Sequence, residues 1–273
     1  MPSIDKAFVR KSFNASAETY DRHAGLQQRL LQQLLGFMGG APAGVARVLD
    51  VGMGTGNLSG RLAELFPAAE VYGCDIADQM ILYARSKLRS SGRLLCCTAA
   101  DAEALPFAAG SFDLVVSSFT YQWLESWDRA LAEAVRVLKP GGVFAFAAFG
   151  QATFYELKQA YRKACYDTGY HGGEALRLAL TEEAMRMTLV RAGYDAPETS
   201  AFRMVETYQS VKHLVRTIKG MGARNASRQR NKNLGVRKVW QRMAAYYAAE
   251  FGSEEGIPAT YEVIMGKGVK SRS

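Results

Sequence analysis

A glycine-rich turn in the first third of the chain constrains the fold more than any other feature. The apolar run 46–51 contains Asp50 near its end, and glycine then stands at every second position, at Gly52, Gly54 and Gly56, before a helical pattern begins. Glycine lets the backbone approach a ligand that a Cβ would block, and it tolerates a positive φ. The stretch therefore predicts a strand, a loop able to cradle a nucleotide, and a helix N-terminus.

The spacing of this loop distinguishes two classes of nucleotide. Dinucleotide sites use G-x-G-x-x-G, with a pyrophosphate at the helix N-terminus, whereas this loop reads G-x-G-x-G and has Asn57 where the third dinucleotide glycine belongs. The carboxylate of Asp50 would repel a pyrophosphate but suits an ammonium group. Asp75, which ends the predicted strand 70–75, could accept hydrogen bonds from both hydroxyls of a ribose. The pattern favours S-adenosylmethionine (SAM), a sulfonium without phosphate, over NAD or a turn that binds nothing.

Strands and helices alternate along the first 150 residues. The predicted strands are 46–52, 70–75, 93–98, 112–118 and 143–149, and the predicted helices between them are 57–66, 78–90 and 128–138. This alternation predicts an α/β fold, a parallel sheet with right-handed crossovers and helices on both faces. Ligands of such sheets bind at the carboxyl ends of the strands. Asp50, Asp75, Asp101 and the segment 117–119 fall at such ends, so we expect them to lie together.

The flanking segments extend this core into one predicted domain, 1–273. An N-terminal arm, 1–40, carries Leu26, Leu30, Leu34 and Met38 on one helical face. The SAM-binding core is expected over 41–150, helices and a late strand over 151–206, a helical insertion over 207–249, and the last strand and tail over 250–273. The late strands are predicted at 199–207 and 259–266. Long connections of this kind usually have a function.

The excess positive charge of the chain is confined to the insertion. The chain has a formal net charge of +8, yet residues 207–249 contain ten Lys and Arg side chains and no Asp or Glu. The rest, with 24 basic and 26 acidic residues, is nearly neutral. Like charges that lie close together repel one another, so a block of this kind favours an anionic partner over a merely solvated surface.

Composition excludes several other classes of protein. No apolar run reaches the ~18 residues of a membrane span, and the first 13 residues lack the apolar segment of a secretory signal. We therefore expect a cytoplasmic protein. The four cysteines show no metal-ligand spacing, so no metal site is predicted.

The core resembles the class I SAM-dependent methyltransferases, which implies a Rossmann-like seven-stranded sheet. The resemblance rests on LDVGMGTG (49–56), the acid at 75, the turn 101–107, FDLVVSS (112–118) and RVLKPGG (136–142). By this resemblance Asp50 and the loop glycines border the methionine part of SAM, Asp75 binds the ribose, and Asp101 and Ala102 flank the adenine. The remaining predicted cofactor contacts are Tyr20, Ile76, Met80, Ser117 and Ser118.

The flanks narrow the resemblance to the malonyl-[acyl-carrier protein] O-methyltransferases of biotin synthesis. The similar segments are FNASAETYDRHAGLQ (13–27), SSFTYQWLESW (117–127), FYELKQAY (154–161), VKHLVRTIKGMGARN (211–225) and IPATYEVIMGKG (257–268). Two pairs depart mildly from the family pattern, Tyr121-Gln122 and Phe154-Tyr155. The resemblance implies methyl transfer from SAM to the free carboxylate of malonyl on acyl carrier protein or coenzyme A, giving the methyl ester that starts pimeloyl synthesis.

The implied nucleophile is a carboxylate, which is ionised at neutral pH and needs no general base. The rate would come from positioning and from the exclusion of water. Tyr20 and His23, spaced i, i+3, share one helical face, and the resemblance places Tyr20 over the cofactor. Gln122 and Trp123 follow a strand end and could line the acceptor cavity. These four are the predicted catalytic residues.

The basic insertion would then bind the acidic carrier protein, because matched charges speed encounter and select partners. The predicted contacts are Lys212, Arg216, Lys219, Arg224 and Arg228. Three alternatives stay open: a SAM-dependent methyltransferase of a small molecule such as a quinone precursor, an RNA-binding or RNA-modifying protein, and a regulatory SAM-binding protein. The oligomeric state is not fixed by the sequence, although a monomer is favoured.

Overall fold

A seven-stranded sheet forms the centre of the protein in the computed structural model, which describes residues 4–39, 44–90, 96–171, 180–221 and 235–272. Its strand order is β3-β2-β1-β4-β5-β7-β6, and β1 to β5 pair in parallel whereas β7 is antiparallel to both neighbours. The strands are β1 (Arg47–Val51), β2 (Glu70–Asp75), β3 (Cys96–Ala99), β4 (Phe112–Ser118), β5 (Leu138–Phe149), β6 (Tyr194–Tyr208) and β7 (Ile257–Lys270). The predicted α/β class and strand positions are confirmed.

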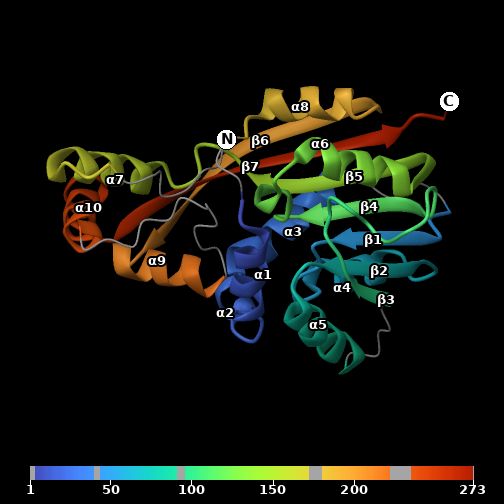
Figure 1. Ribbon diagram of the computed structural model, residues 1–273, viewed down its shortest axis with the longest axis horizontal. Coiled ribbons are helices and arrows are strands. Elements are labelled where there is room, and N and C mark those ends of the chain that lie inside the picture. Colours follow the sequence, from blue (N-terminus) through green and yellow to red (C-terminus); the bar gives the residue numbers. More distant parts are fainter. Residues whose placement is uncertain (1–3, 40–43, 91–95, 172–179, 222–234, 273) are drawn as a thin grey trace.

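Helices cover both faces of this sheet (Figure 1). The helices are α1 (Lys6–Asn14), α2 (Tyr20–His23), α3 (Gly25–Phe37), α4 (Asn57–Leu65), α5 (Asp78–Ser90), α6 (Trp127–Val137), α7 (Tyr155–Thr168), α8 (Glu182–Arg191), α9 (Val211–Gly220) and α10 (Gly235–Phe251), with a 3₁₀ turn η1 at Tyr121–Trp123. The predicted limits were too narrow at three strands, since β6 begins at Tyr194 instead of 199 and β7 spans Ile257–Lys270 instead of 259–266. β5 begins at Leu138 instead of 143, because the Pro-Gly-Gly stretch stays in the strand and shifts its register against β4.

Strand residues alternate between two apolar cores, as a sheet buried on both faces requires. Val48 and Leu114 face the core that α3 and α4 cover, whereas Leu49 and Val115 face the core that α6 and α8 cover. The predicted apolar face of the arm helix α3 is buried in the first of these cores through Leu26, Leu30, Leu31 and Leu34. This part of the arm therefore belongs to the folding unit of the sheet.

The strands β6 and β7 extend past the rest of the sheet, and the late helices gather around that extension. Figure 1 shows α7, α9 and α10 at this end of the molecule, with α9 next to the arm helices. A buried carboxylate fastens α7 to β7, since Glu156 accepts hydrogen bonds from the backbone N–H (2.9 Å) and the hydroxyl of Thr260. None of the described helices has the length and apolarity needed to cross a membrane.

Replacement of Leu34 by alanine tests whether the arm helix belongs to the core. Leu34 is fully buried, so Leu34→Ala should lower the free energy of unfolding by about 2–5 kcal/mol. Leu65→Ala is the matched control, because that leucine is 54% exposed and its loss should cost within about 0.5 kcal/mol. Guanidinium unfolding measures both, and equal costs would show that α3 is not part of the core.

Candidate cofactor and active site

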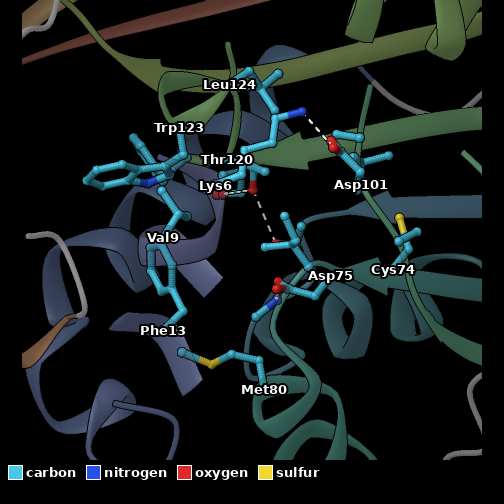
Figure 2. Close-up of a pocket in the computed structure, with 18 of the residues that line it drawn as sticks. Lys6, Val9, Phe13, Cys74, Asp75, Met80, Asp101, Thr120, Trp123 and Leu124 are labelled. Atoms are coloured by element: carbon cyan, nitrogen blue, oxygen red, sulfur yellow. Dashed lines mark hydrogen bonds and ion pairs between the residues drawn. The ribbon is translucent and has the colours of Figure 1, made fainter. Parts of the chain in front are cut away.

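A pocket lies at the carboxyl ends of β1, β2 and β4, where the sequence predicted it, and the arm covers one side of it (Figure 2). Its empty space, counted together with its open mouth, is about 710 Å³. The predicted cofactor residues that line it are Tyr20, Gly52, Gly54, Asp75, Ile76, Met80, Asp101, Ala102 and Ser118. Three others, Asp50, Gly56 and Ser117, do not line it.

Asp75 is the best placed acceptor in this pocket. One carboxylate oxygen accepts the backbone N–H of Ala77 (2.8 Å), and the other accepts that of Gly54 (2.9 Å). Burial raises the pKa of Asp75 to about 6, although these backbone donors oppose the rise. Each oxygen retains a further lone pair, so the side chain fits a ligand that offers two neighbouring hydroxyls, as ribose does.

The three loop glycines are required for different reasons. A Cβ at Gly52 would lie 2.0 Å from the hydroxyl oxygen of Thr120, and one at Gly56 would lie 2.8 Å from Leu88 on α5. A Cβ at Gly54 would meet no protein atom within 4 Å, although its φ of +51° still favours glycine. Gly56 is thus explained by the packing of α5, whereas Gly54 borders the pocket and keeps it open.

Asp50 does not reach the pocket, contrary to the prediction that it would bind an ammonium group there. Side chains alternate along a strand, and Asp50 shares the face of Val48, which turns it toward α4. Its carboxylate accepts the Ser59 hydroxyl at 2.6 Å, and its other oxygen is buried without a hydrogen-bond partner. Burial raises the pKa of Asp50 to about 7. Ser117 is likewise buried, and its hydroxyl donates to the carbonyl of Val51 (2.8 Å).

Asp101 lines the pocket but is already paired with the arm. Lys6 on α1 places its ammonium 2.6 Å from Asp101 and 2.9 Å from Glu103. This pair neutralises the cation, so the described lining offers no free positive charge to a phosphate. The surroundings therefore suit a phosphate-free, cationic nucleoside better than a dinucleotide.

The four predicted catalytic residues separate into two pairs. Tyr20 and Trp123 line the pocket, and Phe13 contacts both rings, the indole edge-on at 5.7 Å between centroids. Gln122 instead accepts the backbone N–H of Phe149 (2.9 Å) and fixes the end of β5.

The fourth predicted catalytic residue, His23, packs against α9. The contact is close, because a Cβ added at Gly220 would lie only 2.3 Å from the His23 ring. Neither His23 nor Gln122 is among the described residues that line the pocket.

Sequence reasoning missed several lining residues, among them Lys6, Val9, Phe13, Thr120 and Leu124. Phe13 opens the arm segment that carries the family resemblance, so a signal for it was present. Lys6 had none, because its position depends on how α1 crosses the pocket. Figure 2 shows Val9 and Phe13 on one side of the cavity and Asp75 and Asp101 on the other. Among the described residues, no three His, Cys, Asp or Glu side chains are placed to hold a metal ion.

The predicted partner-binding residues lie on one exposed helical face where the structure describes them. Lys212, Arg216 and Lys219 of α9 are exposed, opposite the buried Val211, Leu214 and Ile218. Arg224 and Arg228 lie outside the described residues.

Comparisons with known proteins show the family of this chain. Residues 49–146 match the family described as methyltransferase domain. The chain is 42% identical to the malonyl-[acyl-carrier protein] O-methyltransferase of Geobacter sulfurreducens, over 97% of this chain and 99% of that protein. It is 39% identical to the protein of the same name from Laribacter hongkongensis, over 96% and 88%. The phosphoethanolamine N-methyltransferase 2 of Haemonchus contortus, solved with SAM, shares the fold with a TM-score of 0.58 and 18% identity, over 94% of this chain and 57% of that one.

The fold, the pocket and the matched domain define a class I SAM-dependent methyltransferase. Within that class, the near full-length identity shows that this chain belongs to the malonyl-[acyl-carrier protein] O-methyltransferase family.

The pKa of Asp75 gives a test of its role toward the ribose. Below about pH 6 the free protein holds Asp75 protonated, and the proton must leave before both oxygens can accept hydroxyls. The affinity for S-adenosylhomocysteine should therefore fall about tenfold from pH 7 to pH 5. Calorimetry at several pH values measures it.

Two variants test whether Asp75 is the group that causes this pH dependence. Asp75→Asn should bind weakly with a flat profile, whereas Asp50→Asn should retain the loss of affinity at low pH. A flat profile in the unmodified protein, or an unaltered slope in Asp75→Asn, would contradict the role of Asp75.

Proposed function

We propose that this protein transfers the methyl group of SAM to the free carboxylate of malonyl carried on acyl carrier protein. The observation that carries the proposal is the extent of the 42% identity, which spans the arm and the basic helices as well as the cofactor core. Those flanking segments are the parts of the chain that an acceptor and its carrier would meet. The product is the malonyl methyl ester from which pimeloyl synthesis for biotin begins.

The residues present fit the cofactor. Asp75 would accept the ribose hydroxyls, Gly52 and Gly54 would border the methionine part, and Asp101 and Ala102 would flank the adenine. When bound, SAM supplies an electrophilic methyl group on its sulfonium. These assignments are supported by the free lone pairs of Asp75 and by the Gly54 position, where the protein leaves space.

The reaction needs little proton chemistry from the protein. The malonyl carboxylate is already ionised at neutral pH. Burial, with Asp75 and Asp21 nearby, raises the pKa of Tyr20 far above its usual range, so its phenol stays protonated. Tyr20 can therefore donate a hydrogen bond but cannot act as a base. A single neutral donor suits this step, because a strong clamp on the attacking carboxylate would stabilise the ground state as well.

Positioning and the exclusion of water are then the main contributions of the protein. Tyr20 and Trp123, joined by Phe13, supply aromatic walls that would exclude water from the reacting groups. In this scheme Gln122 and His23 do not contact the reacting groups. Gln122 holds the end of β5, and His23 packs the arm against α9.

The exposed cations of α9 would receive the carrier protein. Lys212, Arg216 and Lys219 project from the helix that packs on the arm, so an acidic partner bound there would lie close to the pocket. Among the described residues these three form no ion pair, which leaves them free to match an acidic surface.

An acceptor comparison tests the proposed function. Purified protein and methyl-labelled SAM are incubated with malonyl-carrier protein, malonyl-CoA, acetyl-carrier protein or bulk RNA. We expect base-labile label on malonyl-carrier protein, less or equal label on malonyl-CoA, and none on the acetyl carrier, which lacks a free carboxylate. Base-stable label on RNA with no malonyl ester would overturn the proposal.

Charge reversal on α9 tests the carrier surface. The double variant Arg216→Glu with Lys219→Glu should raise the KM for malonyl-carrier protein on the order of tenfold, because like charges would then face the acidic carrier. SAM affinity should barely change. Arg85→Glu with Arg89→Glu, the same charge change on the exposed side of α5, is the control. Equal damage in both variants would show that α9 is not the docking surface.

A further inference from the structure

Asp21, next to Tyr20 on α2, connects the arm to the glycine-rich loop. One oxygen of its carboxylate accepts the Thr55 hydroxyl (2.6 Å) and the Asn57 side-chain amide (3.0 Å). Its other oxygen lies 2.7 Å from the ammonium of Lys87 on α5. Although partial burial alone would raise the pKa of Asp21, these donors hold it below its usual range, so the side chain is a carboxylate at neutral pH.

The loop side chains are directed at this carboxylate. Asn57 occupies the place of the third dinucleotide glycine. Its amide also donates to the Thr55 oxygen (3.1 Å), and its carbonyl oxygen accepts from Lys87 (2.6 Å). Helix α4, which begins at Asn57, has no acidic residue in its first turn and no side-chain cap. A negative charge near a helix N-terminus is stabilising, and Asp21 supplies it from another element.

Further contacts hold the arm across the pocket. At the other end of the arm, Lys6 pairs with Asp101 and Glu103. Between the two ends, the Asn14 side chain accepts the backbone N–H of Gln79 (3.0 Å), and Arg10 pairs with Asp78 at the start of α5. The arm is thus fastened on both sides of the four lining residues that it contributes, Lys6, Val9, Phe13 and Tyr20.

We propose that Asp21 is a positioning residue that couples the cofactor loop to the arm. The loop conformation that borders the cofactor also presents Thr55 and Asn57 to Asp21, and the docked arm brings Tyr20 over the pocket. Coupling of this kind is reciprocal: a bound nucleoside favours the docked arm, and the docked arm raises the affinity for the nucleoside. Because the arm covers one side of the pocket, we expect the higher affinity to appear as slower release. The inference rests on the SAM site of the proposed function and not on the identity of the acceptor.

Dissociation of S-adenosylhomocysteine and hydrogen exchange of the arm test this coupling. Asp21→Ala should speed dissociation on the order of tenfold, since it removes charge-assisted hydrogen bonds. It should also remove the exchange protection that the nucleoside confers on residues 6–23. In methyl transfer, kcat should fall while the KM for the acceptor changes little.

Matched variants separate this role from a general loss of stability. Thr55→Val keeps the shape of the side chain but removes the hydroxyl, so it should show a smaller effect of the same kind, and Thr55→Ser should restore slow dissociation. Arg10→Ala breaks the exposed arm pair with Asp78 and should change the dissociation rate less than about twofold. Leu189→Ala removes a fully buried side chain on α8, in the core on the other face of the sheet, and reports the effect of lower stability alone.

Two results would overturn the coupling: a folded Asp21→Ala protein that releases the nucleoside at the unmodified rate, or equal acceleration in Leu189→Ala. Because nucleoside dissociation and hydrogen exchange are measured without an acceptor, they decide the role of Asp21 even if the malonyl carrier is not methylated. Failure of methyl transfer in the unmodified protein would affect the proposed function alone.

Discussion

The half-buried carboxylate of Asp75 is the interaction on which the rest of the site depends. It accepts backbone N–H groups from the loop after β1 and from the turn after β2, and so it fixes two adjacent strand ends relative to each other. The loop can lie this close because Gly73 on β2 has no Cβ to meet the Met53 sulfur, which would be 2.4 Å away. Partial removal of this carboxylate from water has a cost, and a ligand that donates two hydroxyls to it would relieve that cost.

The pocket is completed by a segment far away in the sequence. The arm supplies an aromatic and apolar side to a cavity whose other side is made of strand ends, as Figure 2 shows. Its contacts combine partly buried charge pairs with the burial of α3 in the sheet core. Apolar packing of α3 anchors the arm, and the polar contacts of α1 and α2 set where its side chains lie over the site. The same arm contacts α9, which links the cofactor site to the exposed basic face.

The sequence predicted the parts of the site that follow from topology. Asp75, Asp101 and Ser118 gather because parallel strands end at one edge of the sheet. Asp50 was expected to bind the ligand because it lies near the end of β1. That expectation overlooked the alternation of side chains along the strand, which turns Asp50 toward α4. Lys6 and Asp21 were not predicted because no local pattern marks them, and their partners are known only when the arm is packed. Gly56 was assigned to the ligand, although the space beside it is filled by Leu88 of α5.

A crystal structure with S-adenosylhomocysteine bound is the most direct test of the account. We expect both oxygens of Asp75 to lie at hydrogen-bond distance, about 2.7 Å, from the two ribose hydroxyls, with the arm docked and Asp21 on the glycine-rich loop. A ribose bound away from Asp75, or a nucleoside seated outside the cavity between the strand ends and the arm, would contradict it.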